Sequence, residues 1–179
     1  GCGPGDTAGY SPGGPGSAAT AQPAGRPAGT HPGSVGRRRV VVTGPVLENE
    51  GLYRLVEEAG GRVVADDTCS GSRHFAGTVA EDQDPFVALA DRHMGRPACP
   101  CRSQGVDARL GHLLDIARER VAQGVILAVR KYCDPHSWDA VDLRAGLRDA
   151  GIPTLVLELD AAVPGERERT RVEAFLENL

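Results

Sequence analysis

A cysteine at the end of a predicted buried strand has the clearest chemical potential in this chain. Cys133 lies in the run KYCDPH, residues 131–136, directly after the apolar segment Gly124–Arg130. Ligands of open α/β sheets bind outside the carboxyl ends of the strands. Cys133 is therefore a ligand for a soft metal or an iron–sulfur cluster, a nucleophile, or a small buried thiol. No Cys-x-x-Cys pair accompanies it, so spacing leaves these interpretations open.

A second polar group follows a predicted strand at 62–65. Residues 66–73 read DDTCSGSR and include Cys69, Ser70 and Arg73. The hydroxyls and the guanidinium could hydrogen-bond a phosphate or a carboxylate, whereas the acidic neighbours of Cys69 argue against a reactive thiolate. A polar loop built from turn residues is the alternative interpretation.

Cys99 and Cys101, separated by one proline, are half of a possible zinc site. With Cys69 and Cys133 they would make a four-cysteine set, but the spacing lacks the paired ligands that are usual for tetrahedral zinc. Near Cys133, residues 134–136 also suggest a Cys/His nucleophile. Adjacent residues in a loop rarely face one another, so a turn at 134–135 is the preferred interpretation.

The elements that must position these residues alternate between strand and helix. Strand signals occur at 39–43, 62–65, 124–130 and 154–158, and helical spacing occurs at 52–59, 85–93, 106–121, around 138–147 and at 172–179. We expect Val121 on the apolar face of the third of these helices, and Trp138, Val141, Ala145 and Leu147 on that of the fourth. This alternation predicts an α/β, Rossmann-like three-layer domain with a mainly parallel sheet of about four strands.

Parallel strands place their carboxyl ends at one edge of the sheet. Gly44, the loop 66–73, Cys133, Glu158 and Asp160 each follow or end a predicted strand. We therefore expect these segments to meet along one rim, and this rim to carry the function.

Composition divides the chain into two parts. Residues 1–36 hold 11 Gly and 6 Pro with Val35 as the sole large aliphatic side chain, which predicts a disordered tail or linker, while 37–179 reads as the globular domain. The net charge of −4 indicates no nucleic-acid surface, and no apolar run reaches the length of a membrane span. Five cysteines and no opening signal-peptide pattern favour a cytoplasmic setting. A chain that starts at Gly1 suggests a fragment or a processed product.

The motifs, taken in order, resemble one known family. They are RVVADDTCSGSR at 62–73, PFVALA at 85–90, GVI at 124–126 with KYCDP at 131–135, GIP at 151–153, LE at 157–158 and TRVEAF at 170–175. This series is similar to the C-terminal half of the subunits of 2-hydroxyacyl-CoA dehydratases and benzoyl-CoA reductases, over residues 38–179. The shared order makes the resemblance more specific than any single motif.

The resemblance implies a 4Fe-4S cluster held by three cysteines at the interface of two Rossmann-like domains, with Cys133 as the ligand from the C-terminal domain. It further implies an acyl-CoA substrate, a sister dehydratase subunit and a separate ATP-dependent iron–sulfur activator protein. The dehydratases of this family are lyases. In their reaction, one electron added to the thioester lets the 2-hydroxyl leave. Cys69, Ser70, Arg73 and Glu158 would contact the substrate or surround the cluster.

The sequence departs from the family pattern because the domain that should bring the other two cluster cysteines is not found. Cys2 is the one thiol of residues 1–36, so we expect the cluster to be completed by residues absent from this chain, and the isolated chain to be inactive. Two alternatives stay open. One is a benzoyl-CoA reductase-type subunit; the other is a non-catalytic α/β module that docks onto a catalytic subunit and uses Cys133 structurally.

Overall fold

Four β-strands form one parallel sheet in the computed structural model, which describes residues 36–97, 99 and 105–179. The strands are β1 (Arg38–Gly44), β2 (Gly61–Thr68), β3 (Gly124–Arg130) and β4 (Thr154–Leu159). Their order across the sheet is β2-β1-β3-β4, and each neighbouring pair is parallel. The predicted strand count and direction are confirmed.

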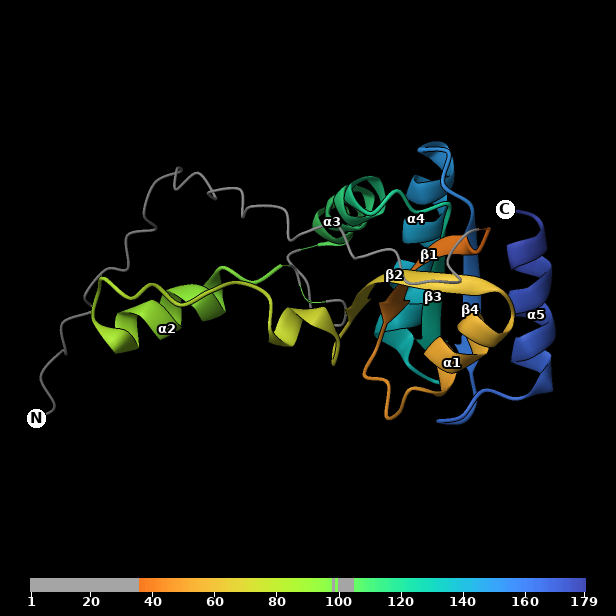
Figure 1. The fold of residues 1–179 in the computed structure, drawn as a ribbon, viewed down its shortest axis with the longest axis horizontal. Coiled ribbons are helices and arrows are strands. Elements are labelled where there is room, and N and C mark those ends of the chain that lie inside the picture. The colour runs from red at the N-terminus through yellow and green to blue at the C-terminus, as the bar shows by residue number, and fades with distance from the viewer. Residues whose placement is uncertain (1–35, 98, 100–104) are drawn as a thin grey trace, which may run out of the picture.

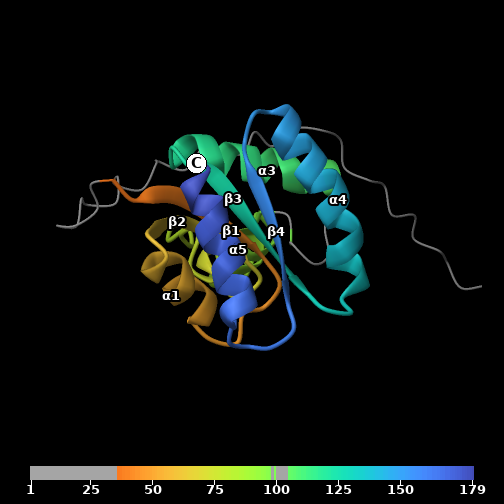
Figure 2. The same ribbon diagram turned by 90° about the vertical axis from the view of Figure 1, so that its right-hand side faces the viewer.

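Helices cover both faces of the sheet, as Figure 2 shows. One face carries α1 (Gly51–Glu58) and α5 (Glu166–Glu177), and the other carries α3 (Val106–Glu119) and α4 (Asp134–Asp149). The remaining helices are a short 3-10 turn, η1 (Ser72–His74), and α2 (Pro85–Met94). These layers confirm the predicted three-layer α/β fold. Within the described residues, no helix combines the length and the apolar character that a membrane span needs.

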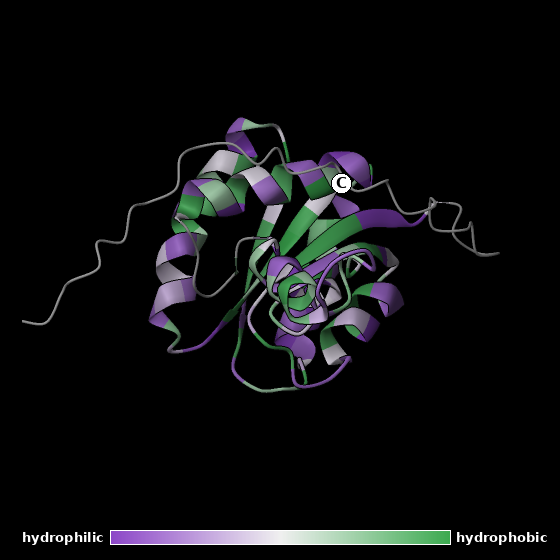
Figure 3. Cartoon of the chain, turned by 90° about the vertical axis from the view of Figure 1, so that its left-hand side faces the viewer, coloured by the Kyte–Doolittle hydropathy of each residue, from purple (hydrophilic) through white to green (hydrophobic). Residues whose placement is uncertain are grey.

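The core lies on both faces of the sheet, because the central strands are apolar at successive positions. Val40 and Val42 of β1 pack toward α1 and α5, whereas Val41 packs toward α3 and α4. Figure 3 shows these strands as the hydrophobic interior of the domain. A continuous apolar run is typical of parallel strands that are buried on both sides. Each such side chain contributes about 2 kcal/mol through burial.

Two predicted helix faces are partly wrong. In α4, Trp138 and Val141 are 74% and 69% exposed, and Val121 lies beyond the end of α3 with a positive φ of 48°. The buried face of α4 instead consists of His136, Ala140, Leu143 and Leu147. These residues recur at helical intervals, as the predicted residues also do. The prediction wrongly placed the large apolar side chains, and not the histidine, on the buried face. The helical spacing predicted at 52–59 and 172–179 falls on α1 and α5, whose buried residues are Leu52, Leu55 and Val56, and Val172 and Leu176.

Strand β2 is longer than predicted. It continues through Asp66, Asp67 and Thr68, three residues that the sequence assigned to a loop. Their backbone pairs with Val42, Thr43 and Gly44 of β1, and Asp67 and Thr68 are buried. Polar residues can extend a buried strand when partners elsewhere satisfy them. The predicted tail at 1–36 lies outside the described residues except for Gly36.

Helix α2 lies apart from the helices that cover the sheet, as Figure 1 shows. Asp84 caps it by accepting hydrogen bonds from two backbone N–H groups of its first turn. Ala88 is its one buried residue, and the side chains of Phe86, Leu89 and Met94 are exposed. We call this helix with its exposed apolar side chains the α2 arm. Exposed apolar surface of this kind is typical of a region that binds another protein chain.

Candidate functional site

The rim at the carboxyl ends of the strands brings the predicted segments together. The backbone N–H of Cys69, after β2, donates to the carbonyl of Gly44 at the end of β1, at 3.2 Å. The N–H of Lys131, after β3, donates to the carbonyl of Leu159 at the end of β4, at 3.1 Å. Gly44 has a φ of 151°, and a Cβ there would lie 2.5 Å from the carbonyl oxygen of Ala128. The strand ends are thus closely packed.

Cys133 lies between the end of β3 and the start of α4. The chain turns through Tyr132, whose φ of 66° is in the left-handed region, and the N–H of Cys133 donates to the carbonyl of Arg130 at 3.0 Å. Its own carbonyl accepts from the N–H and the hydroxyl of Ser137, both at 3.0 Å. The thiol is half-buried and forms no disulfide. It therefore lies at the positively polarised end of a 16-residue helix.

Charged side chains surround this turn. Lys131 pairs with Asp160 at 3.2 Å, and Arg130 pairs with Glu48 of the β1–α1 loop at 2.5 Å. Glu158 lies on β4 in register with Val129, and its side chain is exposed. Exposed ion pairs contribute little stability. Their main effect here is to hold the loops around Cys133 to the neighbouring strand ends.

A buried carboxylate that the sequence interpretation missed lies at the end of β2. Asp67 accepts a hydrogen bond from the hydroxyl of Thr43 at 3.0 Å, and its carboxylate faces Arg73 and His112, each at 3.4 Å. The residue is only 4% exposed. We call these four residues the Asp67 cluster. It fixes the guanidinium of Arg73, one of the predicted site residues, against the sheet.

The neighbouring Asp66 organises the turn after β2. Its carboxylate accepts hydrogen bonds from the Tyr53 hydroxyl at 3.0 Å and from the N–H of Thr68 at 2.7 Å. Burial, with the Asp66 charge nearby, raises the pKa of Tyr53 to about 12. Gly71 packs directly on the Asp66 carboxylate, where a Cβ would overlap it. The turn therefore requires glycine at this position.

The serines of this turn are engaged with the protein backbone. The hydroxyl of Ser72 donates to the carbonyl of Asp66 at 2.6 Å. The hydroxyl of Ser70 contacts both the N–H and the carbonyl of Leu47, at 3.3 and 3.4 Å. These contacts give both serines a role in shaping the loop, and their predicted role as anion ligands stays a prediction.

A buried charged cluster joins α3 to α4 close to Cys133. Arg109, 3% exposed, donates to Asp139 at 2.6 Å. His136 is 1% exposed, and burial together with the Arg109 charge lowers its pKa. Residues 134–136 form the first turn of helix α4, so the predicted turn at 134–135 is wrong, and the chain turns at 131–132 instead. The Cys/His nucleophile stays a hypothesis.

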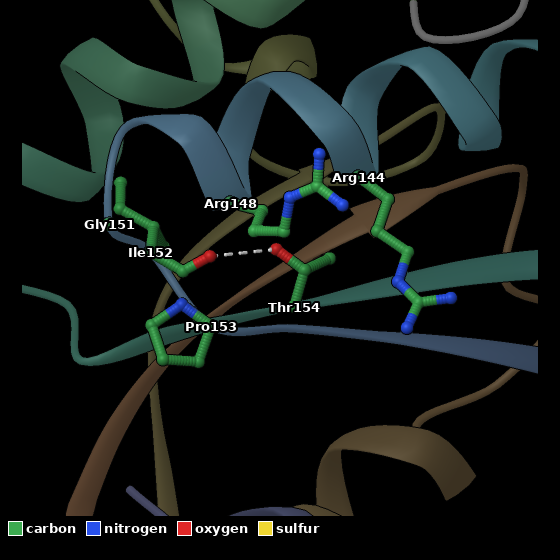
Figure 4. A pocket seen from close by; sticks show the side chains of 6 residues that line it. All are labelled: Arg144, Arg148, Gly151, Ile152, Pro153 and Thr154. Atoms are coloured by element: carbon green, nitrogen blue, oxygen red, sulfur yellow. Dashed lines mark hydrogen bonds between the residues drawn. The ribbon is translucent and has the colours of Figure 1, made fainter.

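Two cavities open on the surface of the described residues. One, of about 340 Å³, lies beyond the end of β2 and is lined by Cys69, Arg73, His74, His93, Arg96, Pro97 and Cys99. The other, of about 360 Å³, lies at the start of β4, where Arg144 and Arg148 extend from α4 over the turn Gly151–Thr154 (Figure 4). The first borders the rim, and the second lies at the opposite edge of the sheet.

No group of three or more metal-binding side chains is placed to hold a metal ion within residues 36–97, 99 and 105–179. Cys69 and Cys99 line the cavity beyond the end of β2, and Cys133 lies between β3 and α4. Cys101 and Cys2 lie outside the described residues, so the four-cysteine zinc hypothesis gains no support. Cys133 fits an iron–sulfur cluster as a single soft ligand at an exposed rim, and its further ligands would have to come from elsewhere.

Comparisons with known proteins agree with the resemblance. The sequence model of the 2-hydroxyglutaryl-CoA dehydratase D-component matches residues 18–179. The (R)-phenyllactyl-CoA dehydratase beta subunit of Clostridium sporogenes is 31% identical over 143 residues, and the lactoyl-CoA dehydratase subunit beta of Anaerotignum propionicum is 27% identical over 144. The (R)-2-hydroxyglutaryl-CoA dehydratase subunit beta of Acidaminococcus fermentans is 27% identical over 146. Each alignment covers 79% of this chain and 38% of the relative, so the chain spans well under half the length of these relatives.

Proposed function

Because the chain belongs to the 2-hydroxyglutaryl-CoA dehydratase D-component family, we propose that it is part of a subunit of an iron–sulfur 2-hydroxyacyl-CoA dehydratase. Such an enzyme is a lyase that removes water from an acyl-CoA thioester. The relatives named above are all dehydratase subunits, which supports dehydration over the reduction of an aromatic ring.

The position of Cys133 is the observation that carries this proposal. A free, half-buried thiol follows the end of a central strand and precedes the N-terminal end of α4. Soft thiolate ligands select iron–sulfur clusters, and a helix N-terminus favours a bound group of negative charge. We assign Cys133 as one cluster ligand and expect the remaining ligands from residues outside this chain.

The other residues of the rim would position and shield the reacting groups. A bound 4Fe-4S cluster supplies one-electron chemistry, whose potential depends on burial and on hydrogen bonds to sulfur. The turn at Tyr132 fixes the direction in which Cys133 leaves the sheet. Glu158 is exposed on the adjacent strand, and Arg73 is fixed by the Asp67 cluster at the far side of the rim. These side chains, with Cys69 and Ser70, are the candidates for contact with the substrate or for the surroundings of the cluster.

A sister dehydratase subunit is the partner that we propose for the α2 arm. Phe86 and Met94 are 84% and 80% exposed, which is unusual for large apolar side chains that form no interface. The relatives carry the word subunit in their names, which supports an assembly of more than one chain. The proposal also includes an ATP-dependent activator protein and a cytoplasmic location, where free thiols stay reduced.

Anaerobic reconstitution with iron and sulfide tests the assignment of Cys133. The chain is reconstituted alone and with a candidate sister subunit, and cluster content is read by absorbance and electron paramagnetic resonance. We expect a cluster with the partner, its loss in Cys133→Ser and its retention in the matched variant Cys99→Ser. Full iron content in Cys133→Ser would refute the ligand assignment.

The alternative from another class is a non-catalytic module that docks onto a catalytic subunit. It predicts that no cluster forms with any partner while the domain stays folded. It also predicts that Cys133→Ser behaves like the parent protein in binding to the sister subunit. A cluster that depends on both the partner and Cys133 would exclude it.

A further inference from the structure

The described residues that line the cavity beyond the end of β2 include four basic side chains and no acidic one. Among its seven described lining residues are Arg73, His74, His93 and Arg96, with two cysteines and one proline. Arg73 pairs with the carboxylate of Asp67 at 3.4 Å, and Asp67 is not among the residues that line the cavity. Among the described residues, the two guanidinium groups therefore line a cavity without an acidic side chain in its wall.

One donor in this lining has no acceptor. The Nε atom of Arg96 is buried from solvent and has no hydrogen-bond partner among the described residues. Because that atom has almost no solvent-accessible surface, a ligand would meet the rest of the half-buried Arg96 side chain, which lines the cavity. A guanidinium is also the side chain best suited to a planar or tetrahedral oxyanion.

The walls of the cavity are held in place by hydrogen bonds between segments that are distant in sequence. Arg73 donates to the carbonyl of Pro97 at 3.1 Å. Arg92, on α2, donates to the carbonyls of His74, Ala76 and Gly77 at 3.1 to 3.3 Å. The basic groups are thus brought together before any ligand arrives, which lowers the entropy cost of binding.

We propose that this cavity binds a phosphate group, with Arg96 and Arg73 as the principal ligands and His74 and His93 at the entrance. Its volume of about 340 Å³ accepts a phosphate together with part of the molecule that carries it. The group can come from free phosphate or from a nucleotide-bearing ligand such as coenzyme A. Only the second source rests on the proposed dehydratase function.

Calorimetric titration of the full chain tests the site without any cluster or activity. The probes are inorganic phosphate, adenosine 3′,5′-bisphosphate and coenzyme A, each at low and high salt. We expect saturable, salt-sensitive binding that Arg96→Gln weakens about tenfold or more, through loss of charge-assisted hydrogen bonds. The matched control is Arg148→Gln in the cavity of Figure 4, which should leave the affinity unchanged.

A second readout uses the two thiols of the lining. Bound ligand should slow the alkylation of Cys69 and Cys99 and leave that of Cys133 unchanged, as followed by peptide mass spectrometry. His93→Gln, an exposed substitution that should not affect folding, provides a second weakening variant. If all variants bound the probes with the same affinity, or if no probe bound at all, the proposal of a phosphate site would be refuted. Because these measurements need no iron, such a result would leave the assignment of Cys133 to its own test.

Discussion

Replacing Asp67 by alanine should reveal how strongly the end of β2 depends on one buried charge. Asp67 holds the guanidinium of Arg73 and the ring of His112, each at 3.4 Å, and accepts from Thr43 at 3.0 Å. The side chains of Asp67 and Arg73 are 5% and 11% exposed. In Asp67→Ala, Arg73 stays in this poorly solvated position without its counter-charge.

The expected magnitude follows from the distances and the burial. Two unit charges 3.4 Å apart attract by about 5 kcal/mol at an effective dielectric constant of about 20. The free energy of desolvating both groups offsets much of this attraction. When one partner is removed, the other charge stays buried and its full desolvation cost remains. We expect Asp67→Ala to lower the free energy of unfolding by about 3 kcal/mol. Arg73→Met alone should lower it by about 2 kcal/mol, because Asp67 keeps Thr43 and His112 as partners.

Urea unfolding of the single and double variants measures the coupling. The double variant Asp67→Ala/Arg73→Met leaves neither charge of the pair unpaired. Its loss of unfolding free energy should therefore be about 2 kcal/mol smaller than the sum of the losses in the two single variants. Asp67→Asn serves as the matched control that keeps the shape and the hydrogen bond from Thr43. A coupling energy near zero would refute the argument, because Arg73 would then be stabilised by solvent and not by Asp67.

Three further predictions concern a tyrosine, a histidine and two helix glycines. Because burial raises the pKa of Tyr53 from 10.0 to about 12, its phenol should ionise near pH 12 in an absorbance titration. The stability that its protonated form contributes should be lost between pH 10 and pH 12. A titration curve that Tyr53→Phe leaves unchanged near pH 12 would contradict this. Burial lowers the pKa of His136 below its usual 6.5, so as the pH falls the unfolded chain takes up a proton on this histidine before the folded chain does. The free energy of unfolding should therefore decrease as the pH drops below about 6.5. His136→Gln should make the urea midpoint less dependent on pH in this range. Gly111→Ala, in open space within α3, should raise the free energy of unfolding by about 0.5–1 kcal/mol, whereas Gly146→Ala should lower it by about 1–3 kcal/mol because its Cβ would overlap Leu110; equal effects of the two substitutions would disprove the close contact of α3 and α4.

The number of the strands and their parallel direction could be read from the sequence. Apolar runs such as Val40–Val42 are buried on both faces and need no distant partner to be recognised. Helices of the expected spacing separate them, which allows only a parallel sheet with crossovers on its faces. That topology alone placed Cys133, Glu158 and the segment after β2 at one rim, and the structure confirms the placement.

The helix faces were less predictable, because periodicity identifies a stripe but not its most buried members. Trp138 offers more apolar area than His136, yet His136 is the buried residue, and the charges of Arg109 and Asp139 act on it there. Buried polar residues are stable only with such partners, and the partners come from a different helix. No local pattern in the sequence carries this information.

The sequence by itself determined the α/β layers, the rim and the family, because hydrophobic periodicity and motif order are local properties of the chain. Only the tertiary structure decided that Asp66 and Asp67 belong to β2, since their hydrogen-bond partners come from α1, β1, η1 and α3. It also decided that Arg73 and Arg96, 23 positions apart in the sequence, line one cavity. The electrostatic interaction between two charges depends on their distance in space, and the number of residues between them in the sequence does not reveal that distance.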